Sequence, residues 1–460
     1  LFSLLSTTGF IGLMGIKLTG PSAIFPTVIL TLAVADSIHI LVTYLQKLRT
    51  EDYTKNDALI ESMRLNFMPV FITSLTTTIG FLTLNFSEVP PFNDLGNIVA
   101  FGMTMAFLFS TTLLPALMSI FPYWKKDNTK ERQISAWYTN FANWVVVYPK
   151  KLTVISIFII AVLGYISSFN IINDEYVEYF DESVEFRVHS DYVNDNLTGF
   201  YNIEFSISSG ESGGISNPSY LRKLDDFKKW FEKQPHVVHV RSYSEVTTRL
   251  NKSMHGDDES FLKIPETREE AAQYLLLYEL SLPFGLDLNN QINVDKSETR
   301  FTAILENTSS REIIKLSNDA EKWLKNNTEN HMHAIAAGIP LMFANLGFRQ
   351  ANAMFKGNIL ALLIISFILI IALRSLRLGL LSIIPNVTPI LVGFGFWAIY
   401  KGTINVGMVV VFGMTMGIIV DDTVHFMSKF LRAKREYGYD TKKAVIYSFE
   451  TVGRALVITT

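Results

Sequence analysis

The sequence predicts a polytopic α-helical membrane protein that carries one large α+β domain outside the membrane. Apolar residues make up 49% of its 460 residues and aromatic residues 13%, and the mean hydropathy of +0.25 is high for a chain of this length. Seven segments are long and apolar enough to cross a bilayer, whose hydrocarbon core of about 30 Å takes about 20 mostly apolar residues. One long polar segment with strand and helix patterns interrupts them and predicts the outer domain.

The apolar segments comprise seven whole spans and two partial ones. The whole spans are Ser22 to Tyr44, Phe67 to Phe86, Ile98 to Phe121, Leu152 to Ile172, Gly357 to Leu373, Leu378 to Tyr400, and Ile404 to Phe430. The partial ones lie at the two ends. Leu1 to Ile16 is apolar with no charged segment before it, and Ala455 to Thr460 stops inside an apolar run. We therefore expect the chain to be truncated at both ends.

Lysine and arginine gather in alternate connections between these spans. The basic connections hold Lys47, Arg49, Lys55, Arg64, Lys125, Lys126, Lys130, Arg132, Lys150, Lys151, Arg374, Arg377, Lys429, Arg432, Lys434, Arg435, Lys442 and Lys443. The connections around Lys17, around Ser87 to Asn93 and around Lys401 have almost no positive charge. Because positive residues are retained on the cytoplasmic side, the basic connections are predicted to be cytoplasmic and the segment from Asn173 to about Asn352 to face outward.

The outward segment has the pattern of an α+β domain. Half-buried strands are predicted at Tyr201 to Ser208, His236 to Ser242, Thr299 to Glu306 and His331 to Ala337. Amphipathic helices are predicted between them, one beginning at Asn217-Pro218 and another following Ser309-Ser310. Strands that alternate with helices indicate βαβ units.

Aromatic and basic residues are mixed between Phe121 and Leu152. The aromatic residues are Trp124, Trp137, Tyr138, Phe141 and Trp144. This composition is typical of a helix that lies in the membrane interface. We predict an anchoring cytoplasmic interfacial helix with its linker at 122–150.

An internal repeat relates residues that are 386 positions apart, without gaps. Asp36 corresponds to Asp422 and His39 to His425. The register continues through Leu45 and Leu431, Arg49 and Arg435, Tyr53 and Tyr439, Ala58 and Ala444, Ile60 and Ile446, Ser62 and Ser448, and Thr73 and Thr459. Both motif helices enter from outside and end at a basic connection, so the repeat is parallel about an axis along the membrane normal. Because the second copy follows an outer domain, we expect the first copy to have had its own, upstream of Leu1.

Acidic residues and histidines lie well inside two spans that the repeat relates. Asp36 precedes His39 by three residues, and Asp421 and Asp422 stand just before His425. A carboxylate at such a depth costs about 2.5 to 3.5 kcal/mol on insertion scales, so it is rare unless it faces the bundle interior, a partner or a water path. An aspartate that only holds helices together is the structural alternative. Two related copies, each with a histidine on the same helix face, favour ion coupling.

The supporting residues are less specific. Each of the two histidines either relays protons or only bonds to a neighbour. Hydroxyl groups follow at Thr73, Ser74, Thr76, Thr77, Thr78, Thr459 and Thr460. A relay role for Thr73 and Thr459 competes evenly with simple helix packing, and Gly413 and Gly417 predict a close helix contact. No zinc-binding motif accompanies the histidines, so neither a metal site nor a cofactor is predicted.

Composition and motifs exclude several other classes of protein. The net charge of −3 is spread along the chain, whereas nucleic-acid binding requires a clustered basic face. The chain has no cysteine, which excludes disulfides, thiolate metal sites and cysteine nucleophiles. No set of nucleophile, base and orienting acid can be assembled from its motifs, so we do not expect an enzyme.

Two motif strings, Val34 to His39 and Gly417 to His425, resemble those of the resistance-nodulation-cell division (RND) superfamily. Within it they are similar to the MMPL-type exporters, which are related to sterol-sensing-domain proteins. The strings Asn217 to Leu221 and Ala272 to Leu280 also resemble this branch, and the likeness covers essentially the whole chain.

The resemblance implies a piece of an RND-type bundle that runs from within the third to within the eleventh of twelve helices. Residues 1–121 would hold the third to sixth helices, 122–150 the interfacial helix, 151–172 the seventh helix and 353–460 the eighth to the start of the eleventh. Residues 173–352 would form a periplasmic porter domain with ferredoxin-like subdomains.

The resemblance also implies a proton-driven transporter in the bacterial inner membrane. Its coupling acids would correspond to Asp36, Asp421 and Asp422. One departure is Ala35, which stands where the second copy has Asp421, so the two halves cannot contribute equally. The implied partners are protons, membrane lipids and a hydrophobic or lipid substrate. A homo-oligomer or an accessory periplasmic protein is left open.

We therefore expect an exporter of hydrophobic or lipid-like molecules, driven by the proton-motive force. Two alternatives use the same core. One is a lipid receptor or sensor of the sterol-sensing type without net transport, and the other is an auxiliary subunit of protein secretion.

Overall fold

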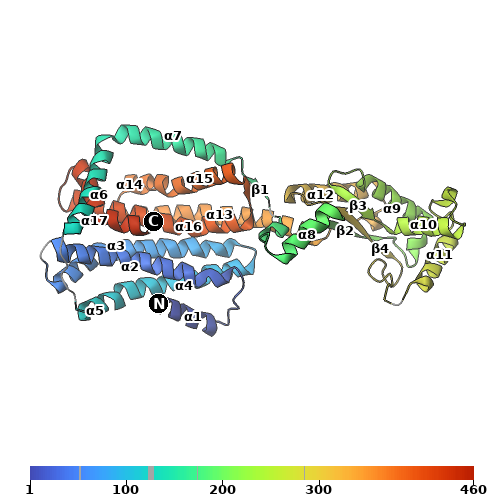
Figure 1. Cartoon of the computed structure of the whole chain (residues 1–460), viewed down its shortest axis with the longest axis horizontal. Helices are drawn as coiled ribbons and strands as arrows, with labels where there is room; N and C mark the ends of the chain where they lie inside the picture. Colours follow the sequence, from blue (N-terminus) through green and yellow to red (C-terminus); the bar gives the residue numbers. More distant parts are fainter. Residues whose placement is uncertain (51–52, 123–128, 174, 284, 460) are drawn as a thin grey trace. The chain divides into compact units, whose positions relative to one another are not determined.

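The computed structural model describes residues 1–50, 53–122, 129–173, 175–283 and 285–459 and divides into two compact units (Figure 1). The helical unit comprises Leu1–Ile172 and Arg349–Thr460. The α+β unit comprises Asn173–Phe348.

The helical unit is built from long apolar helices and two very short strands. Its helices are α1 (Phe2–Leu13), α2 (Phe25–Thr50), α3 (Lys55–Leu82), α4 (Pro90–Thr111), α5 (Leu113–Ile120), α6 (Thr129–Val147), α7 (Pro149–Ser167), α13 (Ile339–Leu373), α14 (Leu376–Leu381), α15 (Ile383–Tyr400), α16 (Val406–Arg435) and α17 (Thr441–Thr459). Helix α13 begins in the α+β unit. The strands β1 (Ile171–Ile172) and β5 (Thr403–Ile404) pair in parallel.

Among the described residues, seven helical segments are long and apolar enough to cross a membrane. They are Ser22–Leu48, Lys55–Phe86, Pro90–Ile120, Pro149–Ser167, Ile339–Leu373, Leu376–Tyr400 and Val406–Arg435. Each overlaps one of the seven predicted spans, and the prediction of a helical multi-pass membrane protein is confirmed. The differences lie at the ends. For example, α3 begins at Lys55 rather than Phe67, because the Thr54 hydroxyl accepts a hydrogen bond from the Asp57 N–H at 3.3 Å and caps the helix there.

Helix α6 occupies most of the predicted interfacial segment and packs against α17. Tyr138 is 8% exposed, and its ring lies so close to Gly453 that a Cβ added there would come within 2.9 Å of it. The rings of Phe141 and Phe449 meet edge to face, with their centroids 5.4 Å apart. At least this face of α6 therefore contacts protein. Trp124 lies outside the described residues.

The α+β unit contains a small sheet and several amphipathic helices. Its elements are α8 (Glu185–Asn196), β2 (Tyr201–Ser208), α9 (Pro218–Phe231), β3 (Val237–Arg241), α10 (Tyr243–Met254), α11 (Arg268–Ser281), β4 (Glu298–Leu305) and α12 (Ser310–Asn327). The sheet order is β2-β4-β3, and β4 is antiparallel to both of its neighbours. Strands β2 and β3 are therefore parallel to each other. The predicted βαβ unit, β2-α9-β3, is present with β4 inserted between its two strands.

One face of this sheet is covered by helices, and its core is rich in aromatic side chains. Along β2, buried residues alternate with partly buried or exposed ones, as expected for a strand with one covered face. Phe205 of β2 and Phe301 of β4 pack against Phe227 of α9, with ring centroids 5.5 and 4.6 Å from that of Phe227. Helix α9 buries this face as its predicted apolar stripe requires.

Three of the four predicted strands and both predicted helix starts are confirmed. Helix α9 begins directly after Asn217, whose side-chain oxygen accepts a hydrogen bond from the Ser219 N–H at 3.0 Å. Helix α12 begins after Ser309, whose hydroxyl accepts one from the Glu312 N–H at 3.3 Å.

The prediction of a fourth regular strand at His331 to Ala337 is wrong. Its first residues belong to a short 3-10 helix, Asn330–Met332. The Ala336 N–H points away from β2 and donates to the Glu321 carboxylate of α12 at 3.0 Å. Only Ala337 bridges to β2, by two hydrogen bonds with Glu204.

Candidate functional site: a buried aspartate and histidine cluster

Four helices of the internal repeat surround the predicted acidic positions. Helix α2 corresponds to α16, and α3 corresponds to α17. Helix α3 contacts both α2 and α16, and α17 also contacts both of them. Each motif helix is therefore flanked by one helix from its own copy and one from the other copy.

Glycines bring α3 and α16 into close contact, as the sequence predicts. A Cβ added at Gly417 would lie 2.7 Å from the Thr77 Cα, and one added at Gly80 would lie 3.2 Å from the Gly417 nitrogen. The Thr77 hydroxyl donates to the Gly417 carbonyl oxygen at 3.2 Å. Small residues at such positions let two helix backbones approach within a membrane bundle.

The two repeat-related histidines meet face to face. The rings of His39 on α2 and His425 on α16 are stacked, with centroids 3.5 Å apart and an angle of 8° between their planes. His39 is 1% exposed and His425 is fully buried. Equivalent residues of a twofold repeat can stack in this way only near its axis, so the pair marks the meeting point of the two copies.

Asp421 bridges the stacked pair. Its carboxylate oxygens lie 3.4 Å from Nε2 of His425 and 3.9 Å from Nε2 of His39. Within the described residues, no ring nitrogen of either histidine has a hydrogen-bond partner, nor does Asp421 Oδ1. Because the first copy has Ala35 at the corresponding position, this bridge exists on one side only. The asymmetry that the sequence indicates thus falls at the centre of the cluster.

Asp36 lies beside this group and is held by a neighbouring hydroxyl. Its side chain is 4% exposed and accepts a hydrogen bond from the Ser74 hydroxyl at 2.9 Å. The Thr73 hydroxyl donates to the Val70 carbonyl oxygen at 3.1 Å and also interacts with Asp421. The sequence singled out Thr73 of this hydroxyl-rich segment, whereas the hydroxyl that binds Asp36 is that of Ser74.

The second copy does not repeat this arrangement at every position. Asp422 is partly buried and interacts electrostatically with Asp421. The Thr459 hydroxyl donates to its own helix, to the carbonyl oxygens of Ala455 and Leu456 at 3.0 and 3.1 Å. Thr460, which corresponds to Ser74, lies outside the described residues.

Lys429 is a buried basic residue that sequence reasoning missed. Predicted among the cytoplasmic connections, it lies inside α16 and is 2% exposed. Its ammonium group donates to the Leu65 carbonyl oxygen at 3.0 Å and to Asn66 Oδ1 at 3.3 Å. Pro69 of α3 has no N–H to offer Leu65, so Lys429 replaces the missing helical donor. Its position four residues after His425 was the available signal, since this spacing puts both residues on one helix face.

The two histidines and Asp421 are also close enough to be considered as metal ligands, since their ligand atoms lie within 4.8 Å of one another. The lone pair of an imidazole nitrogen lies in the plane of its ring. Two parallel rings 3.5 Å apart cannot both direct a lone pair at one ion about 2.0 to 2.1 Å away. The stacked arrangement therefore suits proton exchange better than metal binding.

A groove of about 370 Å³ lies between α15 and α16 on the helical unit. Its lining is mostly apolar and includes Phe394, Met408, Phe412 and Ile418. It suits an apolar ligand such as a lipid chain.

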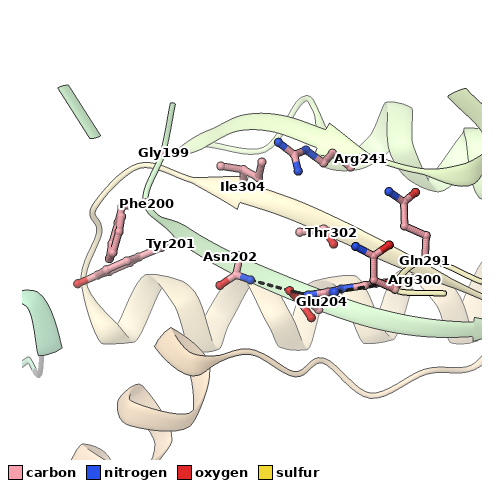
Figure 2. A pocket seen from close by; sticks show the side chains of 11 residues that line it. Gly199, Phe200, Tyr201, Asn202, Glu204, Arg241, Gln291, Arg300, Thr302 and Ile304 are labelled. Atoms are coloured by element: carbon pink, nitrogen blue, oxygen red, sulfur yellow. Dashed lines mark hydrogen bonds and ion pairs between the residues drawn. The ribbon is translucent and has the colours of Figure 1, made fainter. Parts of the chain in front are cut away.

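A cavity of about 340 Å³ on the sheet of the α+β unit has a different character (Figure 2). Asn202, Glu204, Arg300 and Thr302 line it. Arg300 donates to the Glu204 carboxylate, and the Asn202 amide donates to the same carboxylate at 2.6 Å. This ion pair makes the surface polar, so it does not suit an apolar ligand.

Comparisons with known proteins agree with this architecture. The model of the MMPL family matches residues 2–152 and 291–460. The membrane protein MJ1562 of Methanocaldococcus jannaschii is 31% identical over 123 residues, which are 26% of this chain and 31% of that protein. The hopanoid transporter HpnN of Rhodopseudomonas palustris is 32% identical over 118 residues, which are 25% of this chain and 13% of that protein.

The matched segment thus spans less than a third of either relative. The family model, by contrast, covers well over half of the chain, including every helix of the cluster. This chain belongs to the MMPL family.

Proposed function

We propose that this chain forms the membrane core of a transporter that uses the proton-motive force to move hydrophobic, lipid-like molecules out of the inner membrane. The observation that carries the proposal is the cluster of His39, His425 and Asp421, buried where the two repeat copies meet. Ionisable groups at such a depth are costly, and they mark proton relays in pumps and transporters.

The stacked histidines provide a switch between two helix packings. Two imidazolium rings 3.5 Å apart would repel each other by about 5 kcal/mol at an effective dielectric constant of 20. One proton can be shared with Asp421, whereas a second would push α2 away from α16. Protonation therefore biases the packing of one repeat copy against the other, which is the bistable element that coupling requires.

The available energy is sufficient for such a switch. A membrane potential supplies about 2.3 kcal/mol per elementary charge for each 100 mV. One or two protons passing Asp36, Asp421 and Asp422 would therefore drive a modest uphill step. The hydroxyl groups of Thr73 and Thr459 are the proposed relay partners on α3 and α17, and Ser74 joins them through its bond to Asp36.

The substrate class is inferred from the groove between α15 and α16, whose lining is mostly apolar. A relative that shares part of this chain is a hopanoid transporter, and hopanoids are apolar lipids. The α+β unit would act as a porter domain. Its strand order, with β4 between the parallel strands β2 and β3, supports a ferredoxin-like fold in which Ala337 marks an incomplete fourth strand beside β2. The distribution of lysine and arginine supports a periplasmic location for this unit.

The test is proton flux in proteoliposomes that contain the full-length protein and a hopanoid, under an imposed pH gradient. We expect substrate-stimulated flux in the wild type and its loss in Asp36→Asn, Asp421→Asn and Asp422→Asn. Asp94→Asn, on α4, is the matched control and should retain flux.

Equal folding of all variants is checked by circular dichroism and size-exclusion chromatography. Wild-type flux in all three cluster variants would eliminate proton coupling at this site. A lipid-sensing role without net transport would then explain the same helices better.

A further inference from the structure

A basic cavity opens at one end of the helical unit, between α3, α13 and α16. Its volume is about 330 Å³. Five cationic side chains line it, those of Arg64, Arg374, Lys429, Arg432 and Arg435, with Glu436 as the single carboxylate. The cavity therefore carries an excess of positive charge. It lies at the helix ends for which the sequence predicts a cytoplasmic location.

Most of these cations are held in place by partners, and one is not. The Arg432 guanidinium donates to Glu436 at 2.9 Å, and that of Arg64 donates to Glu61 at 2.9 Å. Arg435 donates to the carbonyl oxygens of Leu373 and Arg374, at 2.8 and 3.3 Å. Within the part of the chain that the structure describes, the Arg374 side chain has neither an ion pair nor a hydrogen bond.

The backbone at Arg374 is unusual. Helix α13 ends at Leu373, and Arg374 follows in the left-handed region with φ of 48°. Glycine is the usual residue at such a helix end because it has no Cβ to clash there. An arginine at this position therefore strains the backbone, and such strain is concentrated at ligand-binding and other functional sites.

Lys429 closes the inner end of the cavity. Its amino group is almost wholly buried and faces polar atoms of α3. Apolar side chains such as Met68, Ile72 and Leu431 complete the lining. A ligand here would thus meet guanidinium groups at one part of its surface and hydrocarbon at another.

We propose that this cavity binds the phosphate headgroup of an anionic phospholipid. Arginine matches phosphate oxygens with paired N–H donors, and basic pockets between membrane helices on the cytoplasmic side are suited to acidic headgroups. Arg374 and Arg432 are the principal phosphate contacts, and the apolar lining accommodates the start of an acyl chain. The site does not depend on proton coupling.

The experiment measures phospholipid binding to the purified full-length protein in detergent by native mass spectrometry. Phosphatidylglycerol is compared with phosphatidylcholine. The effects of phosphatidylglycerol and of inorganic phosphate on the melting temperature are measured separately. We expect preferential binding of one phosphatidylglycerol. Loss of one arginine should weaken it about fivefold, and the double variant Arg374→Gln/Arg432→Gln should weaken it about 25-fold.

Arg377→Gln is the matched control, because Arg377 lies three residues after Arg374, in α14, but does not line the cavity. It should leave binding unchanged. Stabilisation by inorganic phosphate that equals that by phosphatidylglycerol would overturn the lipid assignment and identify a site for free phosphate. Equal binding of the two lipids, or equal loss in Arg374→Gln and Arg377→Gln, would refute the proposal.

Discussion

Replacement of Lys429 by methionine tests how α16 and α3 are joined. Methionine keeps most of the length of the side chain but removes the ammonium group, which donates to the Leu65 carbonyl oxygen and to Asn66 Oδ1. Both acceptors would then lie in the bundle without this donor. An unpaired buried acceptor costs about 1 to 3 kcal/mol, and values within membrane bundles are at the low end. We therefore expect a loss of about 2 kcal/mol from the two acceptors together.

A second change separates this loss from the removal of a buried charge, which by itself relieves a desolvation cost. Pro69→Ala restores an N–H that can donate to the Leu65 carbonyl oxygen along α3. Lys429→Met should therefore cost about 1 kcal/mol less in the Pro69→Ala background than in the wild type. The desolvation contribution is the same in both backgrounds and cancels in the double-mutant cycle.

The assay is unfolding of the full-length protein in mixed micelles with increasing dodecyl sulfate, followed by circular dichroism. The four proteins of the cycle are compared at one detergent composition, with Lys442→Met as a control for loss of an exposed lysine. A coupling energy below about 0.3 kcal/mol is within ordinary additivity. That result would refute the view that Lys429 replaces the donor missing at Pro69.

Two further predictions concern other parts of the fold. Gly417→Ala should destabilise the bundle by about 1 to 3 kcal/mol, because the added Cβ would lie 2.7 Å from the Thr77 Cα. Gly393→Ala is the control, because no atom lies within 4 Å of the Cβ added there. It should leave stability unchanged in the same unfolding assay. In the α+β unit, burial raises the pKa of Tyr220 above its ordinary value of 10.0. The folded state then holds this proton more tightly, so the stabilisation is complete below pH 10 and is lost as the pH rises further. Tyrosinate absorbance and circular dichroism, titrated together, check this, and ionisation of every tyrosine at its ordinary pKa before unfolding would contradict it.

Much of the helical unit could be predicted because the constraints of the bilayer act along the chain. A span requires about 20 apolar residues whatever it packs against, so the spans can be recognised without their neighbours. The fourth strand of the α+β unit could not be predicted in the same way. The alternating pattern at His331 to Ala337 is that of a strand, but its first residues form a 3-10 helix, and Ala337 alone of this segment pairs with β2.

The candidate site, too, could be predicted only in part. The repeat relates Asp36 to Asp422 and leaves Asp421 without a counterpart, and helical spacing places a histidine on the same face as the related acids. The structure shows that Asp421 is the acid that contacts both histidines and that Asp36 has a partner of its own in Ser74. Helical spacing defines the face of a single helix but not which helix it meets.

The sequence by itself determined the membrane class, the repeat, the acidic and histidine positions and the close approach at the glycines. These properties depend on hydropathy and spacing, which are local. Only the tertiary structure decided that His39 stacks on His425, that one acid bridges them and that Lys429 is buried against α3. Apart from the contact between Asp421 and His425 within α16, these contacts join residues several hundred positions apart. Their geometry depends on how closely small residues such as Gly417 let the helices pack.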